Sequence, residues 1–247
     1  MLVSRQPRLY AESFAPFCER ARWALDHHGL TYREIEQVPL LAEVTLRLAA
    51  RRLRGPVTVP LLVTEGRTIM DSHEIARWAE ERGTGAPLFR EADEVDRWIE
   101  VSDAIMASGR ALLLDRLSTD ADALAEQLPP FVPAPLRRPL SGSARLGVLH
   151  LRRKYGTQER AADAHETALR GRLEEVRARI TNRAAGLFSY ADITLAASLQ
   201  FILPVAEEHI HLGPASRRAW THARLAEQFA DVLAWRDETY AAFRRRG

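Results

Sequence analysis

The pattern of apolar residues changes at the segment Gly83-Thr84-Gly85-Ala86-Pro87, and this change indicates that the chain has two parts with different secondary structure. Before it, short β-type runs alternate with helical runs, whereas from Asp93 onward nearly every segment has helical periodicity. A chain of 247 residues is long enough for two domains, each with its own core. We therefore expect an α/β domain over residues 1–85 and an all-helical domain over residues 90–247.

The residues from Arg8 to Arg82 predict the element order β-α-β-α-β-β-α, which is a small sheet covered by helices. Gly29 and the helical spacing of Ala21, Ala24 and Leu25 fix the first helix. The expected elements are strands at Arg8–Ala11 and Thr31–Glu36, helices at Phe17–His28, Leu41–Leu53 and Ser72–Arg82, and a hairpin of Val59–Thr64 and Arg67–Met70.

The second part begins with apolar residues from Val95 to Met106 at helical spacing, which predict one long helix. Further helices are expected from about Glu159 to Ile180, from Ser189, and from Leu225 to Tyr240. Between them the segment 128–142 contains Pro129, Pro130, Pro133, Pro135 and Pro139. Because a helix interior does not tolerate so many prolines, we expect an extended loop or lid there.

The charge balance gives no indication of a nucleic-acid partner, since 35 Lys and Arg face 33 Asp and Glu for a net charge of +2. The basic run Arg244–Arg246 is predicted to be a solvated helix end. No stretch has the roughly 18 apolar residues of a membrane span, and one cysteine forms no internal disulfide. We expect a cytoplasmic protein without a membrane partner.

The segment Ser13–Arg22 (SFAPFCERAR) follows a short apolar run and opens a helix, as a thiol site does. A cysteine at its third position would lie at the positive end of the helix, where a thiolate is stabilised. That position is Ala15, and only Cys18 remains. One turn into a helix, a lone cysteine is usually a small buried apolar residue, so both roles stay open for Cys18.

Two further motifs follow in the same domain. Val59-Pro60 predicts either an edge strand or a cis peptide bond that offers the backbone of Val59 to a peptide-like ligand. At Asp71-Ser72 we expect Ser72 to cap a helix whose first N–H groups receive a carboxylate, while Asp71 pairs with an ammonium group. A ligand with an amine and a carboxylate on one carbon fits this pair.

In this order and spacing, the three motifs resemble the N-terminal domain of the cytosolic glutathione transferases. A fourth segment, Gly186–Ile193, resembles that family's capping box, in which Ser189 bonds the N–H of Asp192 and Asp192 reaches back to the N–H of Ser189. The resemblance implies an α/β thioredoxin-like N-terminal domain with an all-α C-terminal domain, and a homodimer.

The resemblance also implies that glutathione is bound as a substrate, without a metal. The residues that it assigns to glutathione are Val59 and Pro60 for the cysteinyl part, Asp71 and Ser72 for the γ-glutamyl end, and Arg54 with Thr58 for the glycyl carboxylate. It places an acceptor pocket for a small apolar electrophile at Phe14, Ala15, Ile105 and Met106.

The residue that activates the thiol is left open, because the Ser or Cys of the serine and cysteine classes corresponds to Ala15. Ser13, Tyr10 and Cys18 are the alternative catalytic side chains, and the helix dipole with a backbone N–H is a fourth possibility.

Three functions are therefore considered. The first is an enzyme that conjugates glutathione to an electrophile in detoxification or uses it as a reductant. The second is a non-catalytic binding or scaffold protein, and the third is thiol exchange through Cys18, which lacks the partner cysteine of dithiol chemistry. His27-His28 and the segment 207–211 contain metal-ligand residue types without a known ligand spacing, and we expect solvated helix ends at both.

Overall fold

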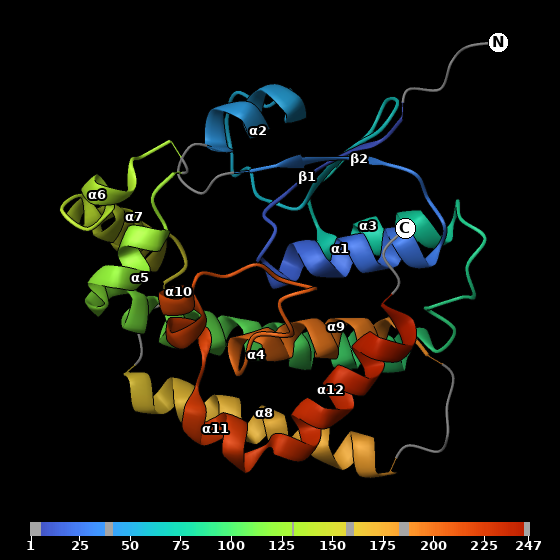
Figure 1. Ribbon diagram of the computed structural model, residues 1–247. Helices are drawn as coiled ribbons and strands as arrows, with labels where there is room; N and C mark the ends of the chain where they lie inside the picture. The colour runs from blue at the N-terminus through green and yellow to red at the C-terminus, as the bar shows by residue number, and fades with distance from the viewer. Residues whose placement is uncertain (1–5, 38–41, 130, 157–160, 183–187, 245–247) are drawn as a thin grey trace. The chain divides into compact units, whose positions relative to one another are not determined.

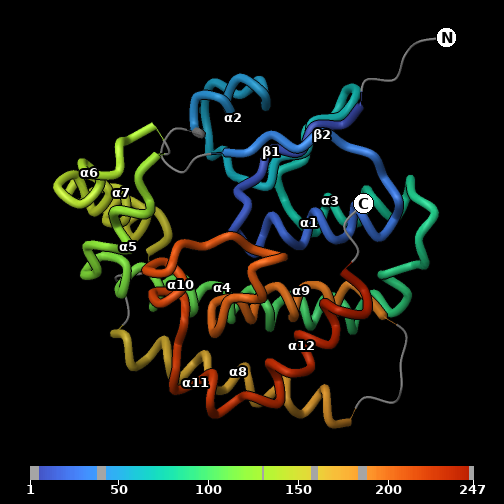
Figure 2. The backbone as a smooth tube through the Cα atoms, viewed as in Figure 1, coloured from blue at the N-terminus to red at the C-terminus, as the bar shows by residue number. Residues whose placement is uncertain are grey.

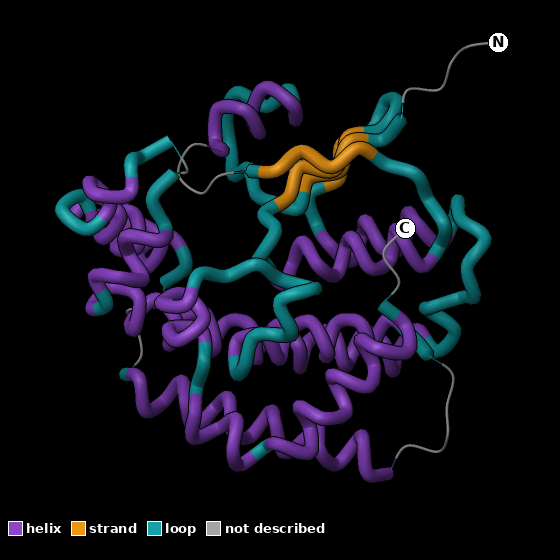
Figure 3. Tube along the Cα trace, in the orientation of Figure 1, coloured by secondary structure: helices purple, strands orange, loops and turns teal. Residues whose placement is uncertain are grey.

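The computed structural model describes residues 6–37, 42–129, 131–156, 161–182 and 188–244. They divide into two compact units, of which the first contains residues 6–96, 188–197 and 239–244, and the second contains the others. All strands of the described residues lie in the first unit (Figure 3). Six residues named in the predictions lie outside the described residues: Leu41, Pro130, Glu159, Gly186, Arg245 and Arg246.

The first unit is built on a four-stranded sheet of β1 (Arg8–Ala11), β2 (Arg33–Glu36), β3 (Leu61–Val63) and β4 (Thr68–Ile69). Their order is β2-β1-β3-β4, with β2 parallel to β1 and the other pairs antiparallel. The register places Leu9 of β1 opposite Glu34 of β2 and Leu62 of β3. The predicted element order of the α/β domain is therefore confirmed.

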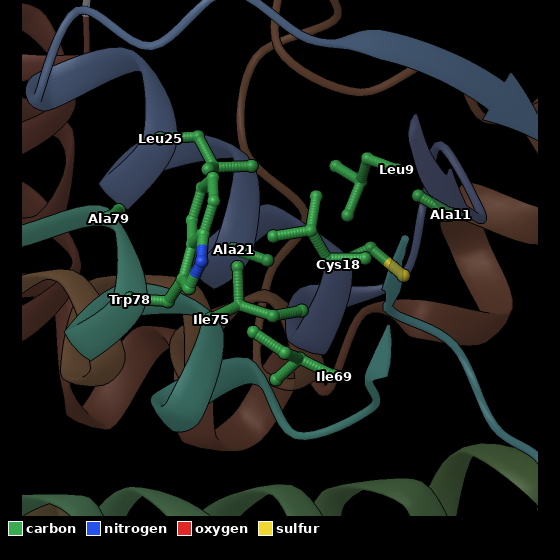
Figure 4. Packing of buried hydrophobic residues seen from close by; sticks show 10 residues of the cluster. Leu9, Ala11, Cys18, Ala21, Leu25, Ile69, Ile75, Trp78 and Ala79 are labelled. Carbon is green, nitrogen blue, oxygen red and sulfur yellow. The ribbon is translucent and has the colours of Figure 1, made fainter. Parts of the chain in front are cut away.

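Helices α1 (Pro16–His27) and α3 (Ser72–Glu80) cover one face of this sheet, and α2 (Ala42–Ala50) covers the other (Figure 1). Side chains alternate between the faces of a strand, so Leu9 packs with residues of α1 and α3 while Tyr10 packs with residues of α2. Figure 4 shows Leu9 and Cys18 in the core against α1 and α3. Helix α2 ends before the predicted Leu53, whose side chain is 94% exposed.

The described secondary-structure elements of the second unit are all helices, and Figure 2 follows its course along the chain. The remaining elements are α4 (Ala92–Thr119), α5 (Ala121–Glu126), α6 (Ala134–Arg137), α7 (Ser141–Lys154), α8 (Ala162–Asn182), α9 (Tyr190–Ser198), η1 (Leu199–Phe201), α10 (Pro214–Trp220), α11 (Ala223–Gln228) and α12 (Ala230–Phe243). The start of α4, most of α9 and the end of α12 belong to the first unit. None of the described helices is long and apolar enough to cross a membrane.

Two predictions for the second part are wrong in detail. The proline-rich segment is not an extended loop throughout, because Ala134–Arg137 forms α6, with Pro135 in the first turn, where a missing N–H is tolerated. The last predicted helix is interrupted at Phe229, whose non-helical backbone separates α11 from α12.

The capping box is confirmed in one half only. The carboxylate of Asp192 accepts the N–H of Ser189 at 2.9 Å, as predicted. The N–H of Asp192 donates to the carbonyl of Ser189 instead of its hydroxyl, and that hydroxyl donates to the Asp192 carboxylate at 3.2 Å.

Two groups that were expected in solvent are buried in the first unit. Arg244 is 9% exposed, and its guanidinium donates to Glu19 at 2.6 Å and to Asp26 at 2.7 Å. His28 is 1% exposed and packs against Gly83, where a side chain would collide with it. Both side chains therefore belong to the interior of the unit instead of to solvated helix ends.

Candidate functional site

The turn between β1 and α1 is held by side chains from α1 and β2. Arg22 donates through Nη2 to the carbonyl of Glu12 at 2.9 Å, and the N–H of Glu12 donates to the sulfur of Cys18 at 3.4 Å. The N–H of Ser13 donates to Oε1 of Glu36 at 3.0 Å. These bonds fix the backbone of the turn directly before the N-terminus of α1.

Helix α1 begins without a side-chain cap. Its N-cap residue, Ala15, has extended backbone angles and no hydroxyl or carboxylate to accept an N–H, and Pro16 follows at the first helical position. The N–H groups of Cys18 and Glu19 donate to the carbonyl of Ala15. The partial positive charge of this helix end is therefore not offset by a capping side chain.

The structure places the three candidate activating residues in different surroundings. Tyr10 is buried in the core against α2, on the face of the sheet opposite to α1. Ser13 is exposed in the turn, and its hydroxyl makes no hydrogen bond to any described residue. Only Ser13 therefore combines exposure with a hydroxyl donor at the N-terminus of α1.

Cys18 lies on the inner side of α1, fully buried among apolar residues. Burial raises the pKa of its thiol from 9.0 to about 12, and nearby Arg22 only partly opposes this effect. Since the thiolate is the attacking species, a buried thiol with this pKa is unreactive near neutral pH. The environment of Cys18 opposes the thiol-exchange hypothesis.

The peptide bond between Val59 and Pro60 is cis, so that alternative is confirmed. The edge-strand alternative is wrong, because β3 begins at Leu61 and pairs with a strand on each side. Neither the N–H nor the C=O of Val59 bonds to another described backbone group. The sheet and the turns of the described chain therefore use neither of these two groups.

The cap of α3 differs from the prediction, because Asp71 is the N-cap residue and Ser72 is the first helical residue. Oδ1 of Asp71 accepts the N–H of His73 at 2.8 Å and that of Glu74 at 3.0 Å. Two of the N–H groups expected to receive a carboxylate are therefore already bonded. Oδ2 of the exposed Asp71 takes part in neither bond.

Ser72 carries two further polar groups at the start of α3, its hydroxyl and its N–H. Its side chain is 4% exposed, and neither its hydroxyl nor its N–H bonds to a described residue. Because neither group is bonded within the described part of the chain, both can bond a ligand or water. Ser72 and Asp71 together offer two donors and a carboxylate oxygen.

The other predicted site residues differ in exposure and lie in both units. Arg54 is exposed and Thr58 is half-buried, both in the segment before the cis bond. Phe14 and Ala15 are half-buried in the first unit, whereas Ile105 and Met106 are fully buried in the second. A fully buried side chain does not contact an acceptor substrate, so the burial of Ile105 and Met106 is an argument against their predicted place in the acceptor pocket.

A polar network beside the site was not expected from the sequence. Nη1 of the buried Arg20 lies 3.2 Å from Nε2 of His73, and Nδ1 of His73 lies 3.0 Å from the hydroxyl of Tyr190. His73 follows Ser72 directly, but Tyr190 is 117 residues further along the chain. In the described part of the chain, no three His, Cys, Asp or Glu side chains gather as a metal site.

Comparison with known proteins finds a match for the part of the chain that contains this arrangement. The model described as "Glutathione S-transferase, N-terminal domain" matches residues 14–82, which contain the start of α1, the cis bond and the Asp71-Ser72 pair. The N-terminal part of this chain is therefore similar to the N-terminal domain of the glutathione S-transferases. A search among curated proteins finds no match.

Solved glutathione S-transferases have the same fold. One from Methylobacterium radiotolerans, in complex with glutathione sulfonate, is 16% identical, with 96% of this chain and 91% of that chain covered and a TM-score of 0.60. One from Methylobacillus flagellatus with glutathione bound is 14% identical, with 96% and 95% covered and a TM-score of 0.61. A family member from Pseudomonas fluorescens with bound glutathione is 15% identical, with 95% and 94% covered and a TM-score of 0.59.

At such low identity, the likeness to these glutathione S-transferases shows the fold alone. The prediction of a thioredoxin-like N-terminal domain followed by an all-α domain is therefore confirmed.

Proposed function

We propose that this protein binds glutathione and conjugates its thiol to a small apolar electrophile, or uses that thiol as a reductant. The observation that carries the proposal is Ser72, a buried residue at the start of α3 whose hydroxyl and N–H have no partner among the described residues. The bound glutathione in two of the solved relatives supports the same ligand.

The γ-glutamyl group of glutathione fits the start of α3, since its carboxylate would accept from the hydroxyl and N–H of Ser72. Its ammonium group would pair with Oδ2 of Asp71, which the helix cap leaves unused. The backbone of Val59 would bond the cysteinyl part, and Arg54 with Thr58 is assigned to the glycyl carboxylate.

This placement directs the ligand's thiol to the start of α1. The thiol would lose its proton to solvent, because the uncapped helix end and the hydroxyl of Ser13 stabilise the thiolate. The thiolate sulfur then forms a bond to the electrophilic carbon, from which a leaving group such as chloride departs with its electron pair.

The proposal is tested by calorimetric titration with glutathione and by conjugation of a chlorinated aromatic. Asp71→Ala is expected to weaken glutathione binding by at least tenfold. Asp71→Asn still caps the helix but has no charge, so this variant measures the effect of the charge on binding without loss of the cap. Asp120 caps α5 through the same pair of bonds, so Asp120→Ala is the matched control and should leave binding unchanged. Absence of binding to the unmodified protein at millimolar glutathione refutes the proposal.

A non-catalytic binding or scaffold role is the second candidate, and Ala15 favours it because this residue has no group to activate a thiol. Glutathione binding without conjugation of any electrophile, and without reduction by the thiol, would support this candidate. A homodimer, a cytoplasmic location and a role in detoxification are further proposals that come with the family.

A further inference from the structure

The hydrogen bonds around His73 form one continuous network, which we call the Tyr190 network: the side chains of Arg20, His73 and Tyr190. It runs from Nη1 of Arg20 to Nε2 of His73 at 3.2 Å, and from Nδ1 of His73 to the Tyr190 hydroxyl at 3.0 Å. It ends on the main chain, because the Tyr190 hydroxyl donates to the carbonyl of Ser72 at 3.3 Å. All of these residues lie in the first unit.

The chemistry of the side chains fixes the direction of every bond in the Tyr190 network. A guanidinium group has N–H donors and no acceptor, so Nε2 of His73 must accept from Arg20. A histidine that accepts at Nε2 carries its proton on Nδ1, and that proton is donated to the oxygen of Tyr190. The hydroxyl proton of Tyr190 is then free for the carbonyl of Ser72.

The rings of the network have little freedom to move. Tyr190 is fully buried, stacks on Phe89 with ring centroids 4.7 Å apart, and meets the His73 ring edge-on at 5.6 Å. Arg20 is also fully buried. Because packing fixes both ends, the network holds the backbone of Ser72 at a set position.

Ser72 is thus held on one side and open on the other. Its carbonyl is bound by Tyr190, and the preceding residue, Asp71, is held by its own bonds to the backbone of α3. Its hydroxyl and N–H have no partner among the described residues. The part of Ser72 that the network leaves unbonded is the part that the proposed function assigns to glutathione.

We propose that His73 and Tyr190 are positioning residues that fix Ser72, and with it the first turn of α3, for the α-amino carboxylate of the ligand. The identity of that ligand rests on the proposed function. Neither side chain contacts the ligand in this proposal, since both act through the backbone of Ser72.

The test compares Tyr190→Phe with Tyr32→Phe. Each change removes one hydroxyl from a tyrosine of the first unit and keeps the ring, and the Tyr32 hydroxyl donates to Asp26 of α1 instead of to the backbone of α3. The first readout needs no ligand: amide hydrogen exchange over His73–Ile75, whose N–H groups are bonded to Asp71, should be about tenfold faster in Tyr190→Phe and unchanged in Tyr32→Phe. Unchanged exchange over these amides in Tyr190→Phe would overturn the inference, whatever the protein binds.

The second readout is the dissociation constant for glutathione. Tyr190→Phe should raise it about tenfold, while kcat at saturating glutathione stays within about twofold, because the network positions the ligand and takes no part in the chemistry. His73→Gln, whose amide has both an acceptor and donors, should restore part of the affinity that His73→Leu loses. Equal affinity in Tyr190→Phe and Tyr32→Phe would overturn the inference, whereas absence of binding to the unmodified protein overturns the proposed function and its ligand assignment.

Discussion

The reactivity of Cys18 gives the sharpest test of which sulfur this protein uses. At pH 8 a thiol with a pKa of 9.0 is about one tenth thiolate, whereas a thiol with the pKa of about 12 imposed on Cys18 is about one ten-thousandth thiolate. We therefore expect iodoacetamide to alkylate Cys18 about a thousandfold more slowly in the folded protein than in the unfolded chain. Its complete burial slows the reaction further.

The assay follows alkylation by intact mass at pH 8, with the same protein in guanidinium as the reference for the unfolded thiol. Ser143→Cys is a built-in control, because it adds a thiol at an exposed position of α7. Only the added cysteine should be labelled in the folded variant. Labelling of Cys18 at a rate within tenfold of the unfolded chain, or a stoichiometric mixed disulfide with oxidised glutathione under native conditions, would refute the reasoning.

Further predictions concern the stability of the first unit, each measured by urea unfolding. Gly83→Ala should lower the free energy of unfolding by about 1–3 kcal/mol, because its Cβ would lie 2.3 Å from Cβ of His28, whereas Gly142→Ala, in open space, should not destabilise. Arg244→Ala should cost about 3–5 kcal/mol, since it removes the nearest cation from two largely buried carboxylates, those of Glu19 and Asp26. Burial lowers the pKa of His28 from 6.5, so, as the pH falls, this histidine is protonated in the unfolded chain before it is protonated in the folded protein. The free energy of unfolding should therefore decrease as the pH drops below about 6.5, and His28→Gln should make this pH dependence weaker.

Local signals were sufficient to predict the architecture of the first unit. The strand Arg8–Ala11 and the order of the following elements depend on periodicity and on turn residues, which act over a few neighbours. The isomer of the Val59–Pro60 bond is different, because cis and trans differ by only about 0.5–1 kcal/mol and the neighbouring sequence does not choose between them. The local sequence therefore does not predict which of the two isomers this bond adopts.

The details of the site were harder to predict, for two physical reasons. Asp and Ser are about equally good N-caps, so the sequence could not tell that Asp71 would take this role and leave the Ser72 hydroxyl unbonded. The bond between His73 and Tyr190 joins residues 117 positions apart, and no local pattern marks such a pair. The ion pairs of Arg244 were missed for the same reason.

The replacement of the expected thiol or hydroxyl by Ala15 is consistent with a protein that uses a sulfur it does not itself carry. The sequence contains one cysteine, and its side chain is buried in the core with a raised pKa. A protein with no accessible cysteine performs thiol chemistry only through the thiol of a ligand. In the proposed function, the uncapped start of α1 and the exposed Ser13 hydroxyl stabilise the thiolate of that ligand, and neither requires a functional side chain at Ala15.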